Sequence, residues 1–240
     1  MECSAILERN DYIMGIFGDG GSVSGYNCEQ VNSLRDVINN VAMKSGERIV
    51  ERLHSEIIVP MSTSWYAPEA VNFFNEFAQA VATSGERITE AFDMFRAAVE
   101  SAGRNWAENT EGEAPSLAAI DLVELKLNVS EIQPKTPNGD VMINEGDANR
   151  VACKLSDVEL TIKSDLQNLA KDLEAETAFL GHGQAEAVQN CFVTVSGEIH
   201  KIFKFLTDGN NSLREQIQQA VKKYQDISSG ISSEFNKVGK

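Results

Sequence analysis

Three histidines, His54, His182 and His200, are the residues of this 240-residue chain best suited to metal or acid–base chemistry. None stands beside a serine or cysteine in a nucleophile motif, which argues against triad chemistry. Glu51 and His54 have the spacing by which ferritin-like bundles present a carboxylate and an imidazole on one helix face, but such sites need a second pair. Glu186 follows His182 by four positions and is again a single pair. We interpret both pairs as solvated surface residues and predict no catalytic residue, no metal and no cofactor.

The cysteines, Cys3, Cys28, Cys153 and Cys191, are the other residues with metal or redox chemistry. They include no Cys-x-x-Cys pair, which argues against a zinc knuckle or a thioredoxin-like site. We expect most of them to be free thiols. Cys28 and Cys153 stand at similar places near the start of two long helical stretches, and a disulfide between them stays open as an alternative.

The charge of the chain excludes some classes of partner. The formal net charge of −15 and the isoelectric point near 4.6 disfavour nucleic acid and anionic membranes, because both attract basic proteins. The apolar stretches are too short and interrupted for a secretory signal or a membrane span, so export would need a signal-independent route. With 42% hydrophobic residues, the chain can bury one sizeable core or two small ones.

Residues 1–25 precede the strong periodic signal. Residues 1–17 predict a short amphipathic helix, and the glycine- and serine-rich residues 18–25 predict a flexible linker. A phosphate-binding loop would need a different glycine spacing and a lysine. We therefore interpret the glycine run as a linker.

Residues 26–109 predict a first helical hairpin, because apolar residues recur every three or four positions. Its first helix should run from about Asn27 to Val59 with Pro60 as the stop, and its second should start near Pro68 and reach about Glu108. The apolar positions of the two helices are Val31, Leu34, Ile38, Val41, Ile49, Leu53 and Ile57, then Phe73, Phe74, Phe77, Val81, Ile88, Phe92, Phe95 and Val99.

Residues 147–240 predict a second hairpin of comparable size. Its first helix carries a heptad stripe suited to packing along another helix at a shallow angle. The stripe consists of Val151, Leu155, Val158, Ile162, Leu166, Leu169 and Leu173. A second helical pattern runs from Val188 to Phe235, and we expect a kink or pause at Gly209.

The connector, residues 110–146, breaks the helical pattern with prolines and an Asn-Gly turn. Its apolar run from Leu117 to Ile132 fits a bridging helix or a strand pair. In the strand alternative, residues 125–129 alternate and residues 141–143 pair with them across the turn. We expect its role to be connection.

A Ser-Gly-Glu triplet recurs within three helical stretches, at Gly46, Gly85 and Gly197. A glycine inside a helix costs about 1 kcal/mol relative to alanine. Its reuse suggests a close helix crossing, with simple tolerance as the alternative.

Two aromatic turns separate the helices of the hairpins. They are Trp65-Tyr66-Ala67 and Phe179-Leu180-Gly181. We interpret Trp65 as a hydrophobic cap between helix ends, with an exposed docking residue as the alternative. Trp106, near the end of the second helix, is interpreted as a packing residue.

A hairpin of this size with an aromatic turn resembles the Trp-x-Gly family of early-secreted-antigen type, small proteins exported by type VII secretion systems, and this chain looks like two of them fused. Trp65 and Phe179 match the aromatic position of the motif, and Gly181 matches its glycine. Ala67 departs from the glycine, and Phe179 departs from the tryptophan. The tail signal Tyr-x-x-x-Asp or Glu is not met, because Ser228 follows Tyr224 by four positions. The resemblance implies that antiparallel hairpins pair into a four-helix bundle.

We therefore predict an all-α protein of two long helical hairpins, packed as a four-helix bundle or coiled-coil-like pseudo-dimer, with an irregular connector. The predicted function is non-enzymatic protein binding. By resemblance, the chain is a tandem substrate or adaptor of a type VII system in a Gram-positive bacterium. It would be cytoplasmic before export and bind the secretion machinery or a co-secreted protein, with a homodimer possible. The alternative is a cytoplasmic scaffold coiled coil that self-associates.

Overall fold

The computed structural model describes residues 26–181 and 183–238 of the chain. The helix predicted over residues 1–17, the glycine linker to residue 25 and His182 lie outside these residues. Within them the fold is all-α, as the periodicity predicts.

The first hairpin starts with α2 (Cys28–Leu53) and ends with α4 (Pro68–Thr110). Asn27 caps α2 by accepting a hydrogen bond from the Gln30 N–H at 3.1 Å. The prediction that the first helix stops at Pro60 was wrong. A π-helical turn, η1 (His54–Ile58), leads into α3 (Val59–Ser64), and this wider turn comes just before the proline, which lacks an N–H for the ladder.

The second hairpin consists of α5 (Glu145–Thr177), a 3₁₀ turn η2 (Ala178–Leu180) and α6 (Gln184–Thr207). The break expected at Gly209 is confirmed. There the chain forms a second 3₁₀ turn, η3 (Gly209–Asn211), before α7 (Leu213–Val238) begins.

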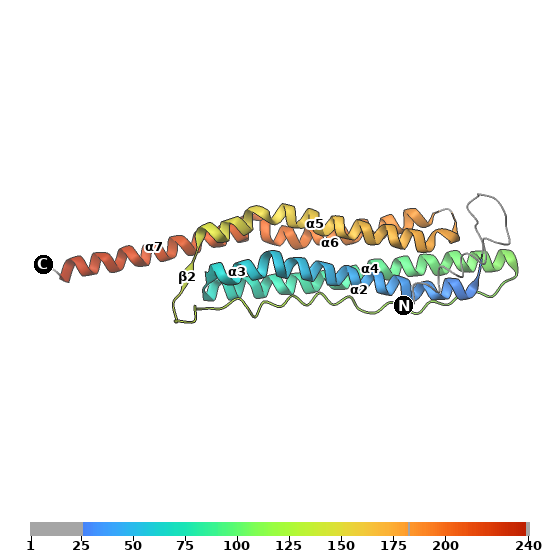
Figure 1. The fold of residues 1–240 in the computed structure, drawn as a ribbon, viewed down its shortest axis with the longest axis horizontal. Coiled ribbons are helices and arrows are strands. Elements are labelled where there is room, and N and C mark those ends of the chain that lie inside the picture. Colours follow the sequence, from blue (N-terminus) through green and yellow to red (C-terminus); the bar gives the residue numbers. More distant parts are fainter. Residues whose placement is uncertain (1–25, 182, 239–240) are drawn as a thin grey trace.

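The two hairpins pack against each other as one elongated four-helix bundle (Figure 1). Helix α2 lies beside α4 and α5, and α6 lies beside α5 and α4, so that every neighbouring pair is antiparallel. The aromatic turns consequently lie at opposite ends of the bundle. The two hairpins are packed together, as one of the predicted arrangements requires, and they share a single hydrophobic core.

Aromatic side chains join the hairpins along α4 and α6. The ring of Phe205 lies 5.6 Å from that of Phe73 and 5.7 Å from that of Phe77. Further along, Phe92 and Phe192 meet edge to face at 5.5 Å. Such pairs contribute about 0.5–1.5 kcal/mol beyond burial, and the aromatic face predicted for the second helix is therefore an inter-hairpin contact.

The connector forms neither a bridging helix nor a hairpin of its own. It runs as an extended chain along the outside of α2 and α4, from the end of α4 back to the first turn (Figure 1). There β2 (Met142–Ile143) pairs antiparallel with β1 (Trp65–Tyr66). The Asn144 N–H also donates to the Ser64 carbonyl at 2.7 Å. The strand partner of residues 142–143 is thus the aromatic turn.

Cys28 and Cys153 are both free thiols, as is the buried Cys191. The disulfide alternative is wrong, since antiparallel pairing of the hairpins puts the starts of α2 and α5 at opposite ends. No helix within residues 26–181 and 183–238 is long and apolar enough to cross a membrane.

Candidate functional site: a strap held between two helices

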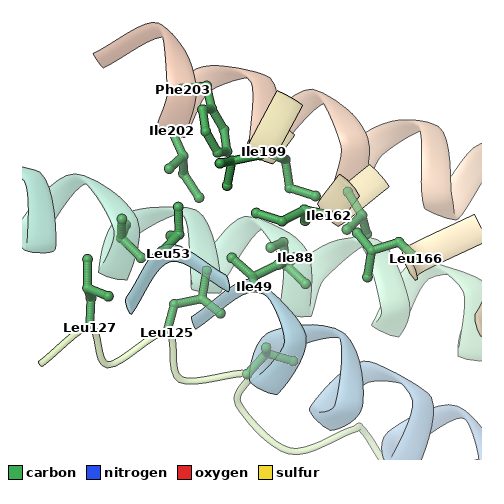
Figure 2. Packing of buried hydrophobic residues seen from close by; sticks show 14 of the residues in the cluster. Ile49, Leu53, Ile88, Leu125, Leu127, Ile162, Leu166, Ile199, Ile202 and Phe203 are labelled. Carbon is green, nitrogen blue, oxygen red and sulfur yellow. The ribbon is translucent and has the colours of Figure 1, made fainter. Parts of the chain in front are cut away.

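The most elaborate arrangement of side chains surrounds residues 115–132, which we call the strap. Its inward-facing residues are buried against α2 and α4, and they are Pro115, Leu117, Ile120, Val123, Leu125, Leu127 and Ile132. From Val123 to Asn128 burial alternates strictly, as in a half-buried strand. Figure 2 shows Leu125 and Leu127 pointing from the strap toward Ile49 and Leu53. The strap is therefore part of the core.

Helix α2 holds the strap backbone through polar residues on one helix face, Asn32, Arg35 and Asn39. The Asn39 carboxamide accepts from the Asp121 N–H at 2.8 Å and donates to the Asp121 carboxylate at 3.0 Å. Arg35 donates to the Ala119 carbonyl at 3.1 Å and to Asp121 at 3.0 Å. These bonds fix the register of the strap on α2.

Helix α4 provides a second row, Thr89, Asp93 and Arg96. The Thr89 hydroxyl accepts from the Val123 N–H at 2.9 Å. Asp93 accepts from the Ile120 N–H at 3.3 Å, and Arg96 donates to the Leu117 carbonyl at 2.8 Å. Arg96 also donates to Asp93 at 2.7 Å, which lowers the pKa of that carboxyl and keeps it an acceptor.

The helices carry glycines where the strap comes closest. A Cβ built on Gly85 would lie 2.5 Å from the Val123 carbonyl oxygen, and one built on Gly46 would lie 2.6 Å from a Val123 methyl carbon. Both distances are too short for real contacts. The close approach inferred from the repeated triplet is therefore to the strap and not to a crossing helix, and Gly197 has no neighbour within 4 Å of such an atom.

The first aromatic turn lies inside the molecule. Trp65 is fully buried, Ala67 is buried, and Tyr66 is half-buried. Trp65 pairs with Ile143 in the short ladder. Its side chain thus occupies the cap position that the sequence favours, beneath the end of the connector.

The second turn packs against the end of α4. Leu180 is buried, Phe179 is partly buried, and Gly181 has a φ of 90°, which suits glycine. The half-buried Trp106 indole donates to the Leu180 carbonyl at 3.3 Å, and the packing role of Trp106 stays a prediction. The six turn residues form two separate sites.

The Glu51–His54 pair predicted as surface residues is divided between different partners. Glu51 accepts from Arg48 at 3.2 Å, and the His54 ring lies 3.2 Å from Glu131. In the second hairpin, the His200 ring of α6 lies 3.1 Å from Glu159 of α5. The described residues contain no cluster of three His, Cys, Asp or Glu side chains arranged to hold a metal ion.

Comparison with protein-family models, curated proteins and solved structures finds no match for this chain. Polar side chains of α2 and α4 hold the extended backbone of the strap by hydrogen bonds. The glycines and apolar side chains of the two helices contact every second residue of the strap. Such an arrangement binds peptide, and here the peptide belongs to the chain itself.

Proposed function

We propose that this protein is a non-enzymatic, protein-binding bundle that acts as a tandem Trp-x-Gly-like substrate or adaptor of a bacterial type VII secretion system. The observation that carries the proposal is the pairing of two antiparallel hairpins within one chain. The resemblance of the two aromatic turns implies this intramolecular counterpart of a hairpin dimer.

The turns support the same proposal by their positions. Trp65 closes one end of the bundle and Phe179 the other, so the aromatic residues occupy equivalent places in two hairpins that run in opposite senses. Docking of a secretion component at these ends stays part of the proposal, with the partly exposed Tyr66 and Gly181 as its accessible residues.

The test is release from a Gram-positive host that carries a type VII system. We expect full-length protein in the culture supernatant of cells with an intact secretion ATPase and little in cells without it. A cytoplasmic marker protein measured in the same fractions controls for lysis. Equal release from both strains would remove the export proposal.

A self-associating scaffold is the second candidate, and α7 is the observation that favours it. The helix continues past the bundle (Figure 1), and its residues Ile227 and Ile231 are 49% and 53% exposed. An exposed apolar stripe of this kind pairs readily with another helix.

Light scattering coupled to size exclusion, over a wide concentration range, separates the two candidates. The export protein should be a 26.3 kDa monomer or its dimer, whereas a scaffold should grow with concentration. Replacing Ile227 and Ile231 by glutamate should abolish that growth if α7 drives it. Growth that survives the replacement would assign assembly to another surface.

A further inference from the structure

The strap presents one free backbone edge, in residues 124–128. On the opposite edge, the Val123 carbonyl and the Leu125 nitrogen lie against Gly85 of α4. Successive residues of an extended chain direct their N–H and C=O groups to opposite edges. The backbone groups of Glu124, Lys126 and Asn128 therefore point toward α2.

These groups have no partner in the part of the chain that the structure describes. Nearer the start of the strap, side chains of α2 and α4 receive the N–H groups of Ser116, Ile120, Asp121 and Val123. Within residues 26–181 and 183–238, no hydrogen bond reaches the backbone of residues 124–128. The edge has the unsatisfied donors and acceptors of an edge strand.

A groove of about 580 Å³ runs beside this edge. Its apolar lining comes from Met43, Val50 and Val123, and Gly46, against which the Val123 side chain packs, also lines it. Such a wall can receive apolar side chains of a strand that pairs with the strap.

The rim of the groove is acidic. Glu47, Glu51 and Glu124 line it, with Lys126 and His54 as the basic residues. Lys126 is already paired with Glu124, as Arg48 is with Glu51, whereas Glu47 has no ion pair among the described residues. A second copy of a chain with net charge −15 would be repelled, so the complementary partner is basic.

We propose that this edge binds an extended basic segment of a partner protein by strand addition. The segment pairs with the backbone of Glu124 and Lys126 and places alternate apolar side chains against Met43 and Val50. Lysine or arginine residues at its ends face Glu47 and Glu51. The inference deepens the proposed function and rests on its protein-binding part, not on export.

Fluorescence anisotropy of the full chain with a labelled peptide, Lys-Val-Thr-Val-Thr-Val-Lys, tests the proposal. Two control peptides carry N-methyl groups on the valines or on the threonines. Only one set of N–H groups faces the strap in a two-stranded pair. We expect one methylated peptide to lose binding and the other to keep it. Equal binding of all three peptides would overturn the proposal, as would no binding at millimolar concentration.

A matched pair of variants tests the protein side. Lys126→Pro removes the N–H on the groove edge, whereas Lys126→Ala keeps it and removes the same side-chain charge. We expect Lys126→Pro to bind the peptide about tenfold more weakly than Lys126→Ala does. The two variants should have equal far-UV circular dichroism spectra. Equal affinities of these two variants would overturn the backbone pairing.

Charge reversal supplies a variant that leaves the strap backbone intact. Glu47→Lys together with Glu51→Lys should lower the affinity for the basic peptide. Added salt should reduce the difference in affinity between this variant and the parent chain. An unchanged affinity at low salt would overturn the acidic rim as the selective element. ATPase-dependent release and peptide binding, both measured on the unmodified chain, separate the two proposals: release without peptide binding removes this site alone, and peptide binding without release removes export alone.

Discussion

The α2–α4 hairpin and the α5–α6 hairpin share a helix-turn-helix design, but they differ in what lies across their helices. The first is covered by the strap, with Leu125 and Leu127 in the core. Across the second, Glu159 of α5 lies 3.1 Å from the His200 ring of α6, and within α5 the same carboxylate accepts from Lys163 at 2.6 Å. An apolar segment buried across the two helices thus covers the first hairpin, whereas a partly exposed charged contact spans the second.

This difference explains why the repeated glycines are not equivalent. Gly46 and Gly85 lie under the strap, and neither has room for a Cβ. Gly197 belongs to the hairpin without a strap and faces open space. A shared triplet in sequence therefore serves a close contact in one half and none in the other.

If the strap is part of the core, removing one of its apolar side chains should destabilise the fold far more than removing an exposed apolar side chain of the other hairpin. Leu125→Ala deletes a side chain that is 1% exposed, and we expect a loss of about 2–4 kcal/mol in the free energy of unfolding. Leu160→Ala, at a position that is 65% exposed in the other hairpin, should change it by less than about 0.5 kcal/mol. Urea unfolding followed by circular dichroism measures both. Similar small changes for the two variants would mean that the strap is not part of the core.

The same substitution at Gly85 and at Gly197 should change the stability in opposite directions. Gly85→Ala gains helix propensity of about 1 kcal/mol, but the new Cβ presses on the Val123 carbonyl, and overpacking costs about 1–3 kcal/mol. We expect a net loss near 1 kcal/mol. Gly197→Ala should stabilise by about 0.5–1 kcal/mol, because nothing opposes the propensity gain. The same urea experiment reads both, and stabilisation by Gly85→Ala would show that the strap does not press on α4.

The Asp93 carboxylate should contribute modestly to the acid sensitivity of the fold. Arg96 lowers the pKa of Asp93 below its ordinary value of 3.8, so the folded state binds the proton less readily than the unfolded state. The stabilising contribution is therefore present above about pH 4 and is lost as the pH falls through the folded-state pKa. Asp93→Asn keeps an acceptor for the Ile120 N–H but cannot titrate.

Urea midpoints measured from neutral pH down to about pH 3 compare this variant with the parent chain. The parent should lose more stability than Asp93→Asn on acidification, and Asp140→Asn, at an exposed position beyond the strap, serves as the control. If the urea midpoints of the parent and of Asp93→Asn fall in parallel as the pH is lowered, the Asp93 carboxylate does not contribute to the acid sensitivity of the fold.

Helical periodicity predicts the helices well because each presents an apolar stripe to one shared core. Val151, Leu155 and Ile162 are buried as their spacing requires. Pro60 misleads because a π-helical turn lets the helix pass a residue that usually ends one. No local pattern specifies that widening, which depends on the packing around it.

The position of the strap could not be predicted from local sequence patterns. Alternation at Val123, Leu125 and Leu127 indicates an extended segment, but strands normally pair with strands. The partner here is a groove between two helices, and the signal for that groove is spread over Asn39 and Thr89, far apart in sequence. Polar residues at helical spacing beside the apolar stripe could have indicated it.

The length of the extended connector also decides at which end of the bundle α5 starts. Helix α4 has 43 residues and is about 65 Å long at 1.5 Å per residue. Residues 115–132, at about 3.3 Å each, span roughly 60 Å and return the chain to the end where α4 began. Helix α5 then starts beside the first turn and runs antiparallel to α2. A short loop in place of the connector would start α5 at the other end and reverse the second hairpin, so the length of an irregular segment selects which pseudo-dimer the chain can form.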